Sequence, residues 1–281
     1  SEADELLDKL ADFVSEHADL DSILDLGKSA PPLAVDSEPE TDGRPPSSPS
    51  VNTADNPERS RIGYVRDRAF WFYYRENLAA LEKAGAELVP VSLLAGAPWP
   101  ELDGLYIGGG LPELHLSALS SNIEARRHVA DLANRGLPIY AECGGFMYLC
   151  RSIRKDGTSY PMSGVFPVSV CFHSRPQGLG YVEVECIGSN RFHPPGVRLR
   201  GHEFHFSAIE ETGEPENAEE TFAFRLSKGK GMLPLRPGLS YDGLIHQNTF
   251  ASYTHLYAPS CPHWAPAFVE LCRESRRSRT E

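Results

Sequence analysis

Apolar and polar positions along the chain follow three successive patterns. In residues 5–26 the apolar side chains recur at helical spacing and stop near Gly27, which predicts an amphipathic helix, in one or two pieces, that needs a partner surface. Residues 29–60 are rich in proline and acidic side chains and cannot build a core, so they predict a disordered linker. From residue 61 onward apolar strands alternate with amphipathic helices, which predicts a folded domain over residues 61–281.

The folded domain is predicted to be α/β. In its first half strands and helices alternate, a rhythm typical of a mostly parallel sheet flanked by helices on both faces. Its second half is richer in strands, which adds antiparallel strands before one closing helix. The expected strands are 61–67, 87–93, 103–110, 137–143, 163–170, 180–187, 197–209, 221–227 and 241–258, and the expected helices are 73–86, 112–136 (in two pieces), 145–152 and 262–278.

Acidic side chains are concentrated in the N-terminal part of the chain. The 281 residues carry a formal net charge of −12, and 15 acidic and 4 basic side chains fall within residues 1–60. The folded part is therefore close to neutral and has no clustered basic run of the kind that a nucleic-acid surface needs. The six cysteines form no CxxC pair, no secretory signal opens the chain, and no apolar run is long enough for a bilayer. These features predict a cytoplasmic protein without membrane contact.

Cys143 is the first candidate for chemistry. It ends the apolar strand LPIYAEC and is followed at once by Gly144 and Gly145. Ligands gather at the carboxyl ends of parallel strands, and a helix that begins directly after a cysteine favours its thiolate. The arrangement resembles the nucleophile elbow of serine hydrolases, with cysteine in place of serine. A free cysteine is also commonly a small core residue, so this stretch alone leaves both interpretations open; the other five cysteines are interpreted as core residues.

A second glycine cluster, GLYIGGGLPEL at 104–114, also ends a strand before a helix. Its backbone N–H groups can form one wall of an oxyanion hole, with the N–H of Gly144 as the other. A plain strand-to-helix turn is the alternative. The cluster is not a dinucleotide fingerprint, because GGGLPE does not match G-x-G-x-x-G.

A cysteine nucleophile needs a base, and His255 is the best candidate by position, late in the chain at the end of an apolar run. His202 and His205, in GHEFHFS, look like part of a metal motif. They lie three residues apart in a predicted strand, however, and therefore on opposite faces of it. No metal site is predicted.

Residues 61–270 resemble the glutamine amidotransferase domain of the cobyrinate a,c-diamide synthase family, a branch of the triad-type (class I) amidotransferases with a flavodoxin-like fold. Residues 1–28 resemble the last helix of the ATP-binding synthetase domain of that family, so the chain is expected to be the C-terminal part of a longer synthase. The segments that carry the resemblance occur in the order of the family: RIGYVRDRAFWFYYRENLAALEKAGAELVPVSLL, DGLYIGGGLPELHLSALSSN, GLPIYAECGGFMYL, YPMSGVFP, GLGYVEVE, RGHEFHFS and ASYTHLYA.

The resemblance implies a function and names the residues that perform it. Cys143 is implied to be the nucleophile that attacks the carboxamide of glutamine, and His255 the residue that activates it and protonates the departing ammonia. The backbone at Gly109, Gly110 and Gly144 is implied to stabilise the oxyanion. The ammonia would aminate an ATP-activated carboxylate of a tetrapyrrole, with ATP and Mg²⁺ bound by the synthetase domain of the same or a partner chain and no cofactor bound by this portion. A homodimer is one expected assembly of the chain.

One position departs from the wider class. Many triad amidotransferases carry Glu two residues after the histidine, where this chain has Tyr257. Glu142 and Glu203 lie near the motif residues, but the sequence assigns the third catalytic position to neither. Two other functions stay open: another cysteine hydrolase of the same fold, and a non-catalytic interaction domain that retains the fold.

Overall fold

The computed structural model describes residues 2–31, 59–95, 99–188, 190–210 and 218–280. The chain divides into two compact units, Ser1–Ala54 and Asp55–Glu281. The predicted linker, 29–60, falls almost entirely outside the described residues. In the first unit the expected helix forms as two pieces, α1 (Glu2–His17) and α2 (Leu20–Ser29), with Asp19 capping the second by accepting the N–H of Ser22.

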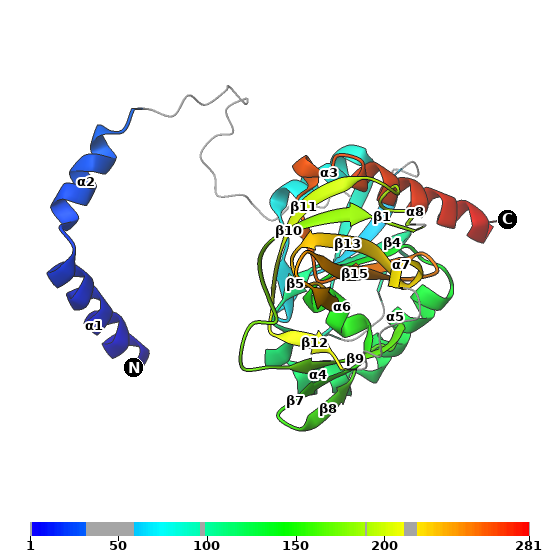
Figure 1. Cartoon of the computed structure of the whole chain (residues 1–281), viewed down its shortest axis with the longest axis horizontal. Coiled ribbons are helices and arrows are strands. Elements are labelled where there is room, and N and C mark those ends of the chain that lie inside the picture. Colours follow the sequence, from blue (N-terminus) through cyan, green and yellow to red (C-terminus); the bar gives the residue numbers. More distant parts are fainter. Residues whose placement is uncertain (1, 32–58, 96–98, 189, 211–217, 281) are drawn as a thin grey trace. The chain divides into compact units, whose positions relative to one another are not determined.

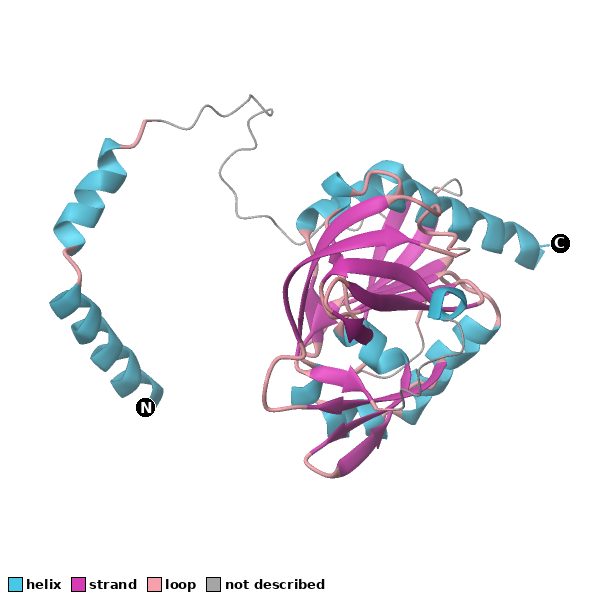
Figure 2. Ribbon diagram, in the orientation of Figure 1, coloured by secondary structure: helices cyan, strands magenta, loops and turns pink. Residues whose placement is uncertain are grey.

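An 11-stranded sheet forms the centre of the second unit (Figures 1 and 2). Its parallel half has the order β3-β1-β4-β6-β16 and continues through antiparallel strands in the order β15-β13-β10-β11-β17, with β14 beside β15. The predicted α/β class with added antiparallel strands is therefore confirmed. The bounds are β1 (Ser60–Val65), β3 (Ala86–Val91), β4 (Gly104–Ile107), β6 (Ile139–Glu142), β10 (Gly178–Cys186), β11 (Arg198–His205), β13 (Phe222–Lys228), β14 (Leu233–Arg236), β15 (Leu239–His246), β16 (Thr249–Ser252) and β17 (His255–Leu256).

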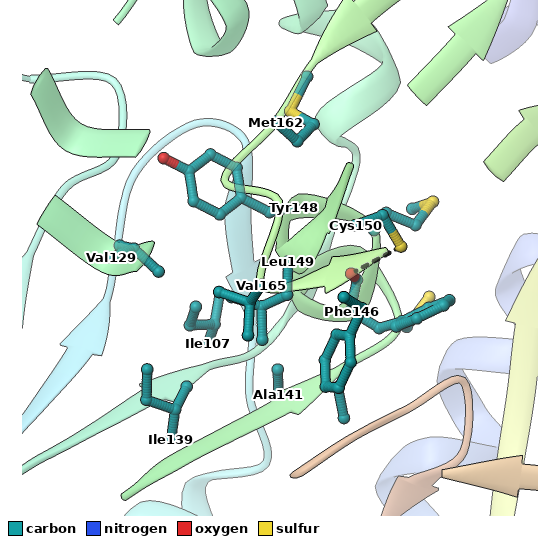
Figure 3. Packing of buried hydrophobic residues seen from close by; sticks show 14 of the residues in the cluster. Ile107, Val129, Ile139, Ala141, Phe146, Tyr148, Leu149, Cys150, Met162 and Val165 are labelled. Atoms are coloured by element: carbon teal, nitrogen blue, oxygen red, sulfur yellow. Dashed lines mark hydrogen bonds between the residues drawn. The ribbon is translucent and has the colours of Figure 1, made fainter. Parts of the chain in front are cut away.

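Helices cover both faces of the parallel half, as the apolar strands predicted. On β4, Leu105 and Ile107 point into one hydrophobic cluster and Tyr106 into the other, because successive side chains of a strand alternate between faces. The first cluster is covered by α4 (Leu116–Ser121), α5 (Ile123–Asn134) and α6 (Gly144–Leu149), and part of its packing is drawn in Figure 3. The second is covered by α3 (Arg75–Ala84) and α8 (Trp264–Thr280).

Two smaller sheets complete the unit. One has the order β12-β9-β7-β8, and the other pairs β2 with β5. Their bounds, with those of the short helices, are β2 (Phe70–Phe72), β5 (Gly109–Gly110), β7 (Cys150–Lys155), β8 (Thr158–Pro161), β9 (Phe166–Phe172), β12 (Ser207–Ile209), η1 (Pro112–Leu114), α7 (Ala218–Thr221) and η2 (Ala258–Ser260).

The strands predicted over 103–110 and 241–258 are each divided in the structure, the first into β4 and β5 and the second into β15, β16 and β17. Two further predicted elements are divided because of their strand pairing. The helix predicted over 145–152 ends at Leu149, because Cys150 opens β7 and pairs there with Phe166 of β9; its thiol still reaches back to the carbonyl of Phe146 (Figure 3). The single strand predicted over 197–209 breaks at Phe206, so that β11 joins the main sheet and β12 joins the smaller one. Periodicity cannot reveal either division, since both depend on which strand lies alongside.

Among the described residues, none of the helices is both long enough and apolar enough to span a membrane.

Candidate active site

Cys143 lies on a strained elbow between β6 and α6. Its φ of 49° and ψ of −101° place a residue with a side chain where few but glycine are found. The surrounding backbone holds this conformation: the N–H of Cys143 donates to the carbonyl of Ser252 at 2.7 Å, and its own carbonyl accepts the N–H of Met147 at 3.0 Å. The side chain is 5% exposed. The backbone at Cys143 therefore has the elbow geometry that the sequence predicts.

The two glycines after Cys143 bring the elbow against the second glycine loop. A β-carbon at Gly145 would collide with the carbonyl oxygen of Ile107, so α6 can pack this closely on β4 only with glycine there. A β-carbon at Gly144 would lie 3.2 Å from the backbone nitrogen of Gly110. The backbones of Gly144 and Gly110 are therefore neighbours, as a shared oxyanion hole requires.

His255 lies against the same glycine loop and belongs to β17, the edge strand at the end of the main sheet opposite β3. A β-carbon at Gly109 would lie 2.6 Å from Cε1 of His255, so the glycine loop runs directly against the imidazole. The ring is 4% exposed, and the ring of Phe72 meets it edge-on with centroids 5.0 Å apart. All five predicted site residues thus lie together around one point, although they come from β5, α6, β17 and the elbow between β6 and α6.

Glu142 is the carboxylate beside His255. Its Oε2 lies 3.4 Å from Nδ1 of His255, and its Oε1 accepts the backbone N–H of Leu256 at 3.3 Å. The hydroxyl of Tyr106 donates to Oε2 at 3.1 Å. Burial alone lowers the pKa of His255, but its hydrogen bonds with Cys143 and Glu142 outweigh burial and raise it to about 10. The sequence left the third position unassigned, and Glu142 is the carboxylate that the structure brings to His255.

Two buried polar side chains fix the segment that carries His255. Asn77 of α3 donates to the carbonyl of Leu256 at 2.9 Å and accepts the N–H of Ala258 at 2.7 Å. Asp242 of β15 accepts the N–H groups of Tyr253 and Thr254 at 3.0 and 2.9 Å and the hydroxyl of Thr254 at 2.7 Å. Sequence reasoning missed both residues, because their partners lie on distant segments and neither belongs to a motif.

His202 of β11 forms part of the same site. Its ring stacks on that of His255, with centroids 4.8 Å apart and an angle of 17° between the planes, and the hydroxyl of Tyr74 lies 3.0 Å from its Nδ1. Burial, and then the charge of His255, lower the pKa of His202 to about 4. His202 therefore presents a neutral ring to His255 at neutral pH.

Glu203 and His205 point to the opposite face of β11, as the alternation predicted. Glu203 accepts the N–H groups of Lys230 and Gly231 at 2.7 and 2.8 Å, and its Oε2 lies 3.5 Å from Nε2 of His205. The ring of His205 in turn stacks on Tyr253 at 3.7 Å. Both residues therefore join strands and loops inside the protein, and Glu203 does not orient His255.

A cavity of about 790 Å³ opens beside His202 and His255. Tyrosine and charged side chains of both signs line it: Tyr74, Tyr181, Tyr257, Glu76, Glu183, Arg200 and Lys228. Its volume lies in the range of small-molecule sites. A small polar substrate can therefore approach the buried histidine from this side.

Comparison with known proteins places this geometry in a family. Residues 61–261 match the CobB/CobQ-like glutamine amidotransferase domain. The chain is 37% identical over 262 residues to the cobyrinate a,c-diamide synthase of Magnetococcus marinus, covering 93% of this chain and 53% of that protein. It is 39% identical over 273 residues to the cobyrinate a,c-diamide synthase of Syntrophotalea carbinolica, covering 96% and 55%. The chain thus spans about half the length of these curated relatives.

Solved structures share the fold. PurLQS from Thermotoga maritima superimposes with a TM-score of 0.51 at 15% identity, over 79% of this chain and 100% of that one. A glutamine amidotransferase structure gives a TM-score of 0.50 at 17% identity, over 75% and 98%. With the family match over residues 61–261, the chain belongs to the CobB/CobQ-like glutamine amidotransferase domain family.

Proposed function

We propose that residues 61–281 form a glutaminase that hydrolyses glutamine through a thioester on Cys143. The sulfur attacks the carboxamide carbon, and the C–N bond breaks as His255 gives its proton to the departing ammonia. Water then gives a proton to His255 and attacks the thioester, the C–S bond breaks, and glutamate leaves with the Cys143 thiolate and the protonated His255 restored. The observation that carries this proposal is the strained Cys143 elbow beside an imidazole that is itself held by Glu142.

Glu142 is proposed to orient His255. A carboxylate at Nδ1 leaves Nε2 free to face the nucleophile and favours the protonated ring that the leaving nitrogen needs. The raised pKa of His255, about 10, supports this role, because the imidazole then carries the proton before ammonia departs. Glu142 is thus proposed to take the orienting role that many triad amidotransferases give to a Glu two residues after the histidine, where this chain has Tyr257.

The backbone N–H groups near Gly110 and Gly144 are proposed to receive the oxyanion, with Gly109 leaving room for His255. Their adjacency supports the assignment, since two donors must converge on the oxygen of the tetrahedral intermediate. Neither donor adds a side chain that would crowd the glutamine.

The ammonia is proposed to pass to a synthetase portion that binds ATP and Mg²⁺ and amidates tetrapyrrole carboxylates in cobalamin biosynthesis. The relatives named cobyrinate a,c-diamide synthase are about twice as long as this chain, which supports a partner portion of that kind. Gly27–Ser29 offers no phosphate loop for that nucleotide, because it ends α2, whereas phosphate binds at the start of a helix.

An apolar surface beside the cavity suits such a partner. Leu179 and Tyr181 of β10 are 68% and 77% exposed, and Phe204, the strand partner of Leu179 on β11, is 54% exposed. Exposed apolar side chains gathered on one face are typical of an interaction surface.

The use of ATP and glutamine further supports the proposed cytoplasmic location. Light scattering of the chain in solution would show whether it also forms a homodimer.

Glutamate release from glutamine, measured for the chain and for Cys143→Ala, tests the proposal. We expect turnover that the substitution abolishes. Turnover that survives it would remove Cys143 as the nucleophile. If neither the chain nor its mixture with the synthetase portion of its own reading frame released glutamate, the non-catalytic interaction domain would be the better account.

A further inference from the structure

Three side chains of types that can bind a metal ion lie close together, away from the active site. His193 lies in the connection between β10 and β11, and Cys261 and His263 lie between η2 and α8. Nδ1 of His193 is 3.2 Å from Nε2 of His263, and Sγ of Cys261 is 3.7 and 3.6 Å from those two atoms. The three ligand atoms form a nearly equilateral triangle. This is the one group of three or more such residues so close together within the described part of the chain.

The size of this triangle matches tetrahedral zinc. Zinc binds imidazole nitrogen at about 2.0–2.1 Å and thiolate sulfur at about 2.3 Å. Tetrahedral angles then separate two nitrogens by about 3.3 Å and a nitrogen from the sulfur by about 3.6 Å. The observed separations agree with these values within about 0.2 Å, the tolerance expected of a real site. A metal ion can therefore enter without displacing the ligands.

The ligands are also held in place from outside the triangle. Nε2 of His193, the nitrogen not used in the triangle, lies 3.2 Å from the hydroxyl of Tyr140, and such a contact fixes the ring of a metal-binding histidine. The side-chain oxygen of Asn190 accepts the N–H of His193 at 3.3 Å. The N–H of Cys261 donates to Ala258 at 2.9 Å. The geometry is therefore fixed by groups that take no part in ligation.

Burial and ligand type select the ion. His193 is fully buried, Cys261 is 2% exposed, and His263 is half-buried, so the ion would sit just beneath the surface with an access side at His263. Thiolate and imidazole suit zinc and do not suit Mg²⁺ or Ca²⁺, which take oxygen ligands. Three protein ligands leave one coordination position for water.

We propose that His193, Cys261 and His263 bind one Zn²⁺ that joins the β10–β11 connection to the start of α8. The ion is structural and takes no part in the chemistry of the proposed glutaminase. Its outer contact, Tyr140, lies on β6 two residues before Glu142, so the ion also supports the strand that carries the catalytic elbow.

The test uses the untagged 281-residue chain, stripped with a chelator and titrated with Zn²⁺ and, separately, Co²⁺. We expect one Zn²⁺ per chain by elemental analysis, a rise in Tm on adding Zn²⁺, and a Co²⁺ spectrum with a thiolate charge-transfer band and intense tetrahedral d–d bands. Cys261→Ser should remove the charge-transfer band. His263→Ala, at the most exposed ligand, should abolish stoichiometric binding while leaving the circular dichroism unchanged.

Two further variants keep the inference falsifiable. Tyr140→Phe keeps all three ligands and should weaken Zn²⁺ binding about 10- to 100-fold, the range for loss of an outer-shell contact. Cys171→Ser, a half-buried cysteine of β9, should change nothing. Zinc below one equivalent with no rise in Tm, or equal binding by the chain and by His263→Ala, would overturn the site whatever the glutaminase assay gives.

Discussion

Nδ1 of His255 lies 3.4 Å from the Glu142 carboxylate, a contact between residues 113 positions apart in the chain. Glu142 immediately precedes Cys143, so the nucleophile and the carboxylate come from the same strand end. The elbow makes this possible, because the positive φ of Cys143 turns the chain sharply after β6. The strand end that carries the Cys143 thiol therefore also carries the carboxylate that contacts His255.

Glu142→Gln should lower the kcat of glutamine hydrolysis about 10²-fold, the lower range for loss of general acid–base function. It should also move the alkaline limb of the pH–rate profile to lower pH, because the carboxylate no longer raises the pKa of His255. Steady-state kinetics across pH measures both effects. Glu203→Gln is the matched control: it should lower stability without moving the limb, and an unmoved limb in Glu142→Gln would contradict the orienting role.

The raised pKa of His255 also predicts a pH-dependent contribution to stability. The folded protein holds this proton more tightly than the unfolded chain, so the contribution is complete below about pH 6.5 and is lost as pH rises toward about 10. Urea unfolding at a series of pH values should show a steeper fall across this window for the chain than for His255→Gln. Equal slopes would show that His255 is not protonated in the folded state.

Asp242→Ala should lower the unfolding free energy by about 3 kcal/mol or more, because it leaves buried donors of Tyr253 and Thr254 without a partner at about 1–3 kcal/mol each. It should also lower kcat, since these residues lead into His255. Asp131→Ala, at an exposed position of α5, should stay within about 0.5 kcal/mol. Denaturant titration decides, and equal stability of the two variants would refute the role of Asp242.

Gly109→Ala should lower kcat about 10²-fold through displacement of His255, since the added methyl would lie 2.6 Å from Cε1 of the ring. Gly27→Ala adds the same methyl where nothing lies within 4 Å and should leave kcat unchanged. Stopped assays on the two variants give the comparison. Full activity in Gly109→Ala would mean that the glycine loop does not border the working imidazole.

Local sequence signals predicted the part of the site that is local. A strand that ends in Cys143 and two glycines predicts an elbow. The glycines at 108–110 predict a close approach of backbones. The position of His255 late in the chain made it the best candidate base, and the family resemblance implied the same residue. All these residues meet in the structure, as expected.

The remaining groups depend on long-range packing. Glu142 is only one of two carboxylates near the motif residues until the pairing of β17 with β11 brings His255 to it. Asn77 and Asp242 act on segments 181 and 12 residues away, respectively, with no motif to mark them. His193 and His263, 70 residues apart, meet only when the β10–β11 connection folds against α8, so the expectation of no metal site came from a sequence in which the cluster is invisible.

Covalent labelling tests whether Cys143 is the nucleophile that attacks glutamine. A diazoketone analogue of glutamine would be incubated with the chain, with Cys143→Ala and with His255→Ala, and the adducts located by peptide mass spectrometry. The account predicts one adduct per chain, on Cys143, that glutamine suppresses by competition, with none in Cys143→Ala and slowed formation in His255→Ala. An adduct on another cysteine, or labelling that persists in Cys143→Ala, would contradict it.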